Sequence, residues 1–201
     1  VAQMPKVPEP LGAQIEALYH LNKAREEGVD RGLVVAATGT GKTYLSAFDS
    51  QGFKRVLYVA HREEILAQAA ATFATVRPQA KMGFFTGQQK DEGDILFATV
   101  QTLARENHLN TFSHNAFDYI VVDEFYALSL HDAFRSQFLL GLTATPFRAD
   151  NKDIFVLCGD NVIYEIYLKD AIHRDLLVPF RYFGIYDATD YSRVEVGNAE
   201  V

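Results

Sequence analysis

The chain has 201 residues and a formal net charge of −7 at pH 7, and 48% of its residues are hydrophobic. This size suits one large α/β domain with or without a short extension, and the acidic balance argues against a protein that coats nucleic acid by bulk attraction alone. The single cysteine, Cys158, excludes an internal disulfide and favours a reducing compartment. No apolar run approaches the roughly 18 residues of a membrane span, so we expect a soluble, cytoplasmic protein that does not contact a membrane.

Three prolines among the first ten residues predict an extended lead-in over residues 1–10. After it, Leu11, Ile15, Leu18, Tyr19 and the stretch from Leu21 to Ala24 give the apolar face of a helix. Gln14 lies in this helix. A glutamine amide can accept from and donate to the N6 and N7 edge of adenine, but a lone glutamine is equally consistent with plain helix surface.

An apolar run that starts at Leu33 stops abruptly in the sequence Thr38-Gly39-Thr40-Gly41-Lys42-Thr43. The two glycines lack a Cβ, so the backbone can turn successive N–H groups inward around an anion. Lys42 can reach the β- and γ-phosphates of a nucleoside triphosphate, and the Thr43 hydroxyl can ligate its Mg²⁺. With Ala36 in the first position, the stretch is a relaxed form of GxxxxGK[ST], set between a buried strand and a helix as that motif requires. It predicts a phosphate-binding loop.

A second buried strand, over residues 55–60, runs into His61 and Arg62, and a helix over residues 63–75 follows. A cation is poorly placed at a helix N-terminus unless an external anion, such as a nucleic-acid phosphate, lies between them. An arginine paired with a nearby carboxylate is the alternative. Further along we expect strands over residues 81–85 and 95–100, and a short helix from Gln101 to about Glu106.

A strand over residues 118–122 runs into Asp123 and Glu124. Two carboxylates at the C-terminal end of a buried strand stand where open parallel sheets bind ligands. Asp123 can hold the Mg²⁺ shell, and Glu124 can orient and deprotonate an attacking water.

The next buried strand, over residues 139–143, ends in Thr143-Ala144-Thr145-Pro146. Hydroxyls at this edge can hydrogen-bond the carboxylate pair and relay its state, and a plain Thr-Pro turn is the alternative. The remaining predicted elements are a helix at 127–137, a strand at 162–168, a helix at 169–177 and an extended aromatic run at 179–186.

From about residue 10 to about residue 187, the chain resembles the first motor domain of a superfamily 2 DEAD/DEAH-like helicase or translocase. Within that superfamily it resembles the bacterial DNA helicases that are similar to the motor subunits of type I and type III restriction enzymes. In the family's order, the matching motifs are Gln14, ATGTGKT at 37–43, VAHREEILAQ at 59–68, TG at 86–87, TVQTL at 99–103, VVDE at 121–124 and GLTATPFR at 141–148. RNA-directed DEAD-box proteins usually carry PTREL and SAT where this chain has AHREE and TAT, so the resemblance favours DNA over RNA.

The resemblance implies a RecA-like P-loop NTPase, an α/β fold with a mostly parallel sheet and helices on both faces, over residues 11–177. Residues 178–201 would then form a strand and linker toward a second RecA-like motor domain. ATP and Mg²⁺ are the implied cofactors, with nucleic acid, DNA before RNA, as the partner.

The resemblance also assigns roles to particular residues. Lys42, Asp123 and Glu124 would be catalytic. ATP would bind to Gln14 and to Thr38, Gly39, Thr40, Gly41, Lys42 and Thr43, and Mg²⁺ to Thr43 and Asp123. Nucleic acid would contact Arg62, Thr86, Gly87, Thr99 and Gln101, and hydrolysis would be coupled to motion through Tyr126, Thr143 and Thr145.

Phe125-Tyr126 depart from the His or Asp that usually closes the VVDE motif, which bears on coupling more than on hydrolysis. Two alternatives to a DNA motor therefore stay open: a nucleotide-gated DNA-binding or scaffolding module that does not unwind, and an RNA helicase. A metabolic kinase is disfavoured because no stretch resembles a small-substrate lid or acceptor site.

Overall fold

The computed structural model describes residues 7–105, 108, 110–123, 134–144 and 152–178. Their strands form one seven-stranded sheet with the order β3-β4-β2-β5-β6-β1-β7, in which every neighbouring pair is parallel. The expected α/β fold with a mostly parallel sheet is confirmed. The strands are β1 (Arg31–Ala36), β2 (Val56–Ala60), β3 (Met82–Phe85), β4 (Ile95–Thr99), β5 (Tyr119–Asp123), β6 (Phe138–Thr143) and β7 (Val162–Ile166).

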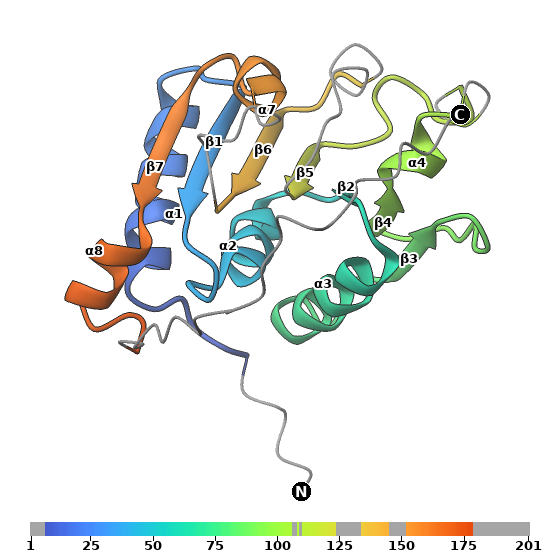
Figure 1. Cartoon of the computed structure of the whole chain (residues 1–201). Coiled ribbons are helices and arrows are strands. Elements are labelled where there is room, and N and C mark those ends of the chain that lie inside the picture. The colour runs from blue at the N-terminus through green and yellow to red at the C-terminus, as the bar shows by residue number, and fades with distance from the viewer. Residues whose placement is uncertain (1–6, 106–107, 109, 124–133, 145–151, 179–201) are drawn as a thin grey trace, which may run out of the picture.

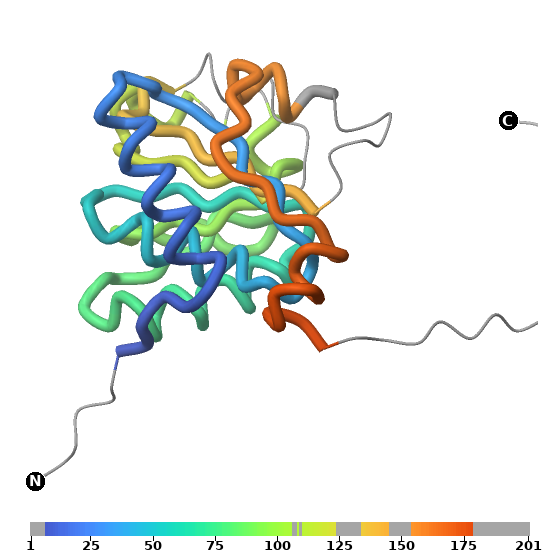
Figure 2. The backbone as a smooth tube through the Cα atoms, turned by 90° about the vertical axis from the view of Figure 1, so that its left-hand side faces the viewer, coloured from blue at the N-terminus to red at the C-terminus, as the bar shows by residue number. Residues whose placement is uncertain are grey.

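Helices cover both faces of the sheet (Figure 1). One face carries α1 (Ala13–Glu26), α2 (Lys42–Asp49), α3 (Glu63–Val76) and α8 (Leu168–His173). The other carries α4 (Val100–Leu103) and α7 (Lys152–Leu157). Figure 2 views the molecule from the side of α1 and β7, which contact each other.

Coverage on both faces explains why the strands are continuous apolar runs. In β1, Val34 and Ala36 point to the core beneath α1 and α2, and Leu33 and Val35 point to the core beneath α7. None of the four is more than 4% exposed. In the described part of the chain, no helix is long and apolar enough to cross a membrane.

The buried face of α1 agrees with the predicted apolar face at Leu21 but not at Ile15 and Tyr19. Ala13, Ala17 and Leu21 are buried, whereas Ile15 and Tyr19 are 55% and 64% exposed. The two alanines line the narrow space between α1 and the loop after β1. Small side chains let the helix approach this loop closely, so the packing here selects alanine over the larger residues that a hydrophobic pattern emphasises.

Other predicted elements also need correction: the helix expected to start at Gln101 is Val100–Leu103, and the strand expected at 162–168 ends at Ile166. The helix predicted over residues 127–137 fails at its end, because residues 134–137 are not helical, and its remaining residues lie outside the described ones. The helix predicted at 169–177 begins at Leu168 and ends at His173. No helix was predicted for α7, although Ile154, Leu157 and Cys158 have helical spacing and are buried.

Candidate nucleotide-binding site and nucleic-acid surface

The loop between β1 and α2 has the backbone geometry of an anion cradle. Gly39 has φ +90° and Gly41 has φ +83°, values that residues with a Cβ rarely adopt. A Cβ on Gly41 would lie 2.3 Å from Nε2 of Gln14, so it would displace the end of that side chain from the loop. Gly41 is also the N-cap of α2, and the loop therefore ends on the positive end of a helix.

Lys42, the first residue of α2, extends back toward the end of β1. Its Nζ donates to the carbonyl oxygen of Ala36 at 3.0 Å, and the Thr40 hydroxyl donates to the carbonyl oxygen of Ala37 at 2.7 Å. Both hydrogen bonds cross the loop and hold its turn. The Lys42 ammonium is thereby kept at the C-terminal end of β1, where the predicted phosphates would bind.

Gln14 connects α1 to this loop. Its Oε1 accepts a hydrogen bond from the Leu11 backbone N–H at 3.0 Å, and its Nε2 donates to the carbonyl oxygen of Gly41 at 3.4 Å. The amide is oriented by both contacts and stands beside the phosphate loop. Gln14 therefore lies next to the predicted phosphate-binding loop, and adenine recognition by its amide stays a prediction.

Asp123 is the last residue of β5 and lies close to the loop across the sheet. It is in register with Leu142 of β6, which is in register with Val34 of β1. Neighbouring strands lie about 4.8 Å apart, so β5 and β1 are separated by about 10 Å, a gap that a lysine and a carboxylate can bridge through one Mg-triphosphate. Thr143, which is 2% exposed, ends the intervening strand β6.

Tyr58, in the middle of β2, holds the Asp123 carboxylate. Its hydroxyl donates to Oδ2 of Asp123 at 2.6 Å, and the tyrosine is fully buried. Sequence reasoning missed this residue. The available signal was a tyrosine inside the otherwise apolar strand Val56–Ala60.

The donor set around the loop fits a Mg-nucleotide. The Thr43 hydroxyl and the Asp123 carboxylate are the hard oxygen ligands that Mg²⁺ prefers, and Lys42 supplies a cation for phosphate. Glu124, Tyr126 and Thr145, which were predicted as base and coupling residues, lie outside the described residues.

The predicted nucleic-acid residues follow three neighbouring strands, β2, β4 and β3. After β2, the Arg62 side chain is exposed at the N-cap of α3, and among the described residues no ion pair or side-chain hydrogen bond involves it. The alternative of a structural ion pair therefore finds no support there. Gln101, also exposed, lies with its Nε2 2.6 Å from Nδ1 of His61, which joins the segments that follow β2 and β4.

The two predicted threonines have structural partners. Thr86 is 3% exposed, and its hydroxyl accepts from the backbone N–H groups of Gln88 and Gln89 at 3.3 Å. Thr99 is 6% exposed and donates to the Thr102 hydroxyl at 2.8 Å. Their contact with nucleic acid stays a prediction, and Gly87 is the exposed residue of the Thr86 turn among those predicted.

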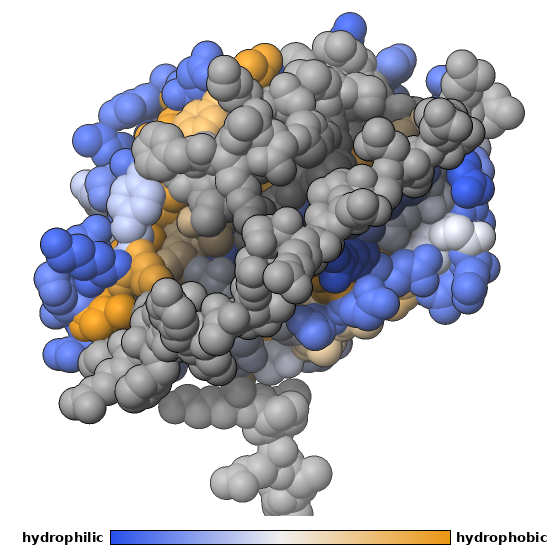
Figure 3. Space-filling view, viewed as in Figure 1, coloured by the Kyte–Doolittle hydropathy of each residue, from blue (hydrophilic) through white to orange (hydrophobic). Residues whose placement is uncertain are grey.

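An open cleft of about 810 Å³ lies between the start of α3 and the end of β5. The described residues that line it are His61, Arg62, Glu63, Glu64, Ile65, Gln68 and Asp123. Figure 3 shows mainly hydrophilic residues over α3 and β3. By its lining residues, the cleft extends from Arg62, which is predicted to contact nucleic acid, to Asp123, which is predicted to hold Mg²⁺.

A parallel sheet with a phosphate loop after β1 and an aspartate at the end of β5 defines a RecA-like domain of the helicase class. Residues 8–148 match the family described as "Type III restriction enzyme, res subunit", and the chain belongs to this family of superfamily 2 helicase-like proteins. The family expected from the sequence motifs is confirmed.

Two curated relatives and one solved structure show the range of the similarity. The chain is 31% identical to Rad25 of Halobacterium salinarum over 75% of its own length and 28% of the relative's. It is 30% identical to the type I restriction enzyme EcoAI endonuclease subunit of Escherichia coli, over 84% of its own length and 23% of the relative's. A structure of the type ISP restriction-modification enzyme LlaGI with a DNA substrate mimic matches with TM-score 0.65 and 19% identity, over 84% of this chain and 21% of that one. The chain thus spans about a quarter of these proteins.

Proposed function

We propose that this chain is the first motor domain of an ATP-dependent DNA helicase or translocase. The observation that carries the proposal is the cleft shared by Arg62 and Asp123, because a predicted nucleic-acid residue and a predicted Mg²⁺ ligand line the same cleft. In a motor, the state of the nucleotide has to reach the nucleic acid. One continuous cleft offers a short path for that coupling.

Each site residue has a role in this proposal. The loop from Thr38 to Thr43 binds the ATP phosphates, with Gln14 at the adenine. Thr43 and Asp123 hold Mg²⁺, which neutralises phosphate charge, and Glu124 activates the attacking water. Tyr126, Thr143 and Thr145 couple hydrolysis to movement on the nucleic acid.

Two features of the relatives support DNA as the nucleic acid. EcoAI is named as a restriction endonuclease subunit, and the LlaGI structure contains a DNA substrate mimic. We extend this preference to the present chain, and propose that it acts together with a second RecA-like domain, toward which residues 178–201 lead. We also propose a cytoplasmic location, as expected from the sequence.

The test is steady-state ATP turnover by the native protein that contains this chain, with and without DNA. We expect DNA to stimulate turnover, RNA to stimulate it less, and the Lys42→Ala variant to show no stimulation. DNA binding that changes with nucleotide but produces no stimulated turnover would instead support a nucleotide-gated scaffolding module. A response to RNA alone would support an RNA helicase.

A further inference from the structure

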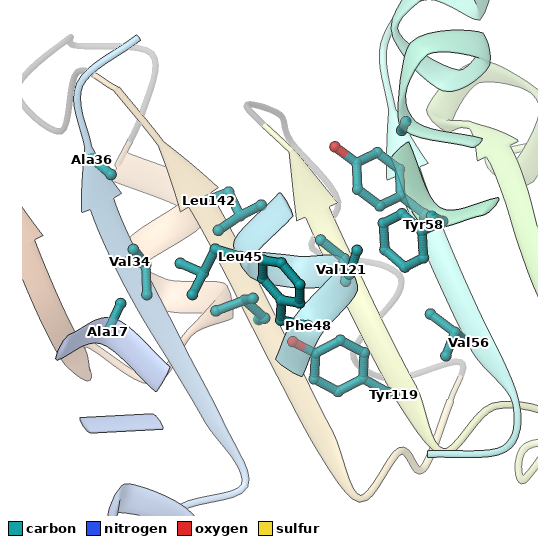
Figure 4. Close-up of a cluster of buried hydrophobic side chains, with 14 of the residues drawn as sticks. Ala17, Val34, Ala36, Leu45, Phe48, Val56, Tyr58, Tyr119, Val121 and Leu142 are labelled. Carbon is teal, nitrogen blue, oxygen red and sulfur yellow. The ribbon is translucent and has the colours of Figure 1, made fainter. Parts of the chain in front are cut away.

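The Tyr58 side chain is held in place by the hydrophobic core on which it packs. The side chain is fully buried, and its ring packs edge-on against Phe73 of α3 at 5.6 Å and beside Phe97 of β4 at 5.7 Å, measured between ring centroids. Figure 4 shows the ring with its hydroxyl directed toward the C-terminal end of β5, where Asp123 lies. The hydroxyl therefore occupies a fixed position 2.6 Å from Oδ2 of Asp123.

Tyr119 makes the same kind of contact at the other end of the sheet. It is also fully buried, on the same face, and its hydroxyl donates to Oδ2 of Asp49 at 2.6 Å. That carboxylate is paired with Arg25 and has only structural partners. Among the described residues, Tyr58–Asp123 and Tyr119–Asp49 are pairs whose tyrosine is fully buried, and the first of them includes a predicted Mg²⁺ ligand.

We propose that Tyr58 is a positioning residue that fixes the Asp123 carboxylate for Mg²⁺. This inference rests on the proposed function. The terminal torsion of an aspartate is broad and nearly two-fold, so a fixed hydrogen-bond donor narrows the orientations that its carboxylate adopts. A rigid donor on Oδ2 selects one orientation and directs the rest of the carboxylate toward the metal shell, as partners of metal ligands generally do.

The rigidity of the donor matters for this role. A surface side chain in place of Tyr58 would lose conformational entropy each time it held the carboxylate, whereas the Tyr58 ring is already ordered by the folded core. Because β2 and β5 are hydrogen-bonded neighbours, the donor and the carboxylate also move together with the sheet. The orientation of Asp123 is therefore set before any ligand binds.

The experiment measures how nucleotide binding by residues 1–201 depends on Mg²⁺, using a fluorescent ADP analogue and a Mg²⁺ titration against EDTA. For Tyr58→Phe we expect the Mg²⁺ concentration for half-maximal enhancement of binding to rise about tenfold. Affinity in EDTA should match that of the parent. This split separates a role in metal positioning from a general weakening of the site.

Tyr119→Phe is the matched control, because it removes an equally buried hydroxyl from an equally close carboxylate. It should leave the Mg²⁺ midpoint unchanged, and circular dichroism should show both variants folded. Equal shifts in both variants, or no shift in Tyr58→Phe, would overturn the inference. A parent chain that binds no nucleotide in Mg²⁺ would overturn the proposed function, and this inference with it.

A double-mutant cycle with Asp123→Asn gives a second, independent measurement. If Tyr58 acts through Asp123, Tyr58→Phe should produce no further shift of the Mg²⁺ midpoint in the Asp123→Asn background. Additive shifts would mean that Tyr58 acts through another route and would overturn the inference.

Discussion

Arg25 and Asp49 form a two-point ion pair between α1 and α2. Nη1 of Arg25 lies 2.8 Å from Oδ2 of Asp49, and Nη2 lies 2.7 Å from Oδ1. The Asp49 side chain is 1% exposed, and Tyr119 of β5 also donates to it. One buried carboxylate therefore joins two helices to the sheet, at the end of β5 opposite Asp123.

Removing this carboxylate should destabilise the fold strongly. Asp49→Ala removes the ion-pair partner of the partly buried Arg25 and the acceptor of the buried Tyr119 hydroxyl, and the about 3–5 kcal/mol typical of a fully buried pair is the upper bound for this loss. Urea denaturation measures the loss. The control is Glu27→Ala, which breaks the exposed Lys23–Glu27 pair and should change stability by less than about 0.5 kcal/mol. A loss below about 1 kcal/mol for Asp49→Ala would contradict the structural role.

Cys158 should be unreactive in the folded protein. Burial raises the pKa of its thiol to about 12, so at pH 8 almost no thiolate is available to a thiol reagent. We expect labelling by an alkylating reagent to follow unfolding, being slow in buffer and fast in denaturant. Rapid labelling of the native chain at pH 8 would contradict the burial of this residue.

The same shift predicts a pH dependence of stability. Because the folded pKa of Cys158 is raised from its ordinary value of 9.0, the unfolded chain ionises first as pH rises. The stability that this thiol contributes is complete below pH 9 and is lost progressively toward pH 12. Urea midpoints of the parent and of Cys158→Ala should therefore converge as pH increases, since their other titrating groups are the same. A difference between the two urea midpoints that stays constant as pH rises would argue against a raised pKa of Cys158.

The sequence predicted the sheet well because strands covered on both faces are continuous apolar runs, and the phosphate loop because its spacing is specific. It failed for part of the buried face of α1, where close packing selects Ala13 and Ala17. It also gave no access to the Tyr58–Asp123 and His61–Gln101 contacts, whose partners are 65 and 40 residues apart. Those pairs depend on the strand order, which local periodicity does not encode.

Arg62 and Lys54 offer a charge-matched test of the nucleic-acid surface. Both are exposed cations beside β2, but Arg62 follows the C-terminal end of the strand and Lys54 precedes its start. Arg62→Ala should weaken DNA binding similarly for all sequences and reduce the slope of log K against log salt by about one, as loss of one phosphate contact does. Lys54→Ala should change neither quantity. Equal effects of the two variants would point to net charge and against a local surface.

Lys42 and Glu124 should have separable effects in the native protein. Lys42→Ala is expected to weaken ATP binding, because it removes the cation at the phosphate loop. Glu124→Gln is expected to retain binding and lose turnover, because only the water-activating carboxylate changes. ATP binding and steady-state hydrolysis, measured on the same preparations, check both expectations. Parental turnover by Glu124→Gln would mean that another group is the base.

Residues 1–201 alone should hydrolyse ATP at close to the background rate. Phosphoryl transfer needs positive charge on the γ-phosphate in its transition state, and an arginine supplied by another domain is worth about 10³–10⁵ in rate. Arg62 lies on the predicted nucleic-acid side of the cleft, and Arg148, outside the described residues, belongs by sequence to the same domain as the phosphate loop. Neither is placed to supply that charge across a cleft between two domains.

The measurement compares ATP turnover by residues 1–201 with turnover by a chain that continues through a second motor domain, each with and without DNA. We expect the short chain to bind Mg-nucleotide modestly and to show neither DNA stimulation nor unwinding. The longer chain should be stimulated by DNA, with a difference of about three orders of magnitude or more, because only it contains the arginine that reaches the γ-phosphate. Equal, DNA-stimulated turnover in both would show that one domain is self-sufficient, and that catalysis here does not depend on an arginine from a partner domain.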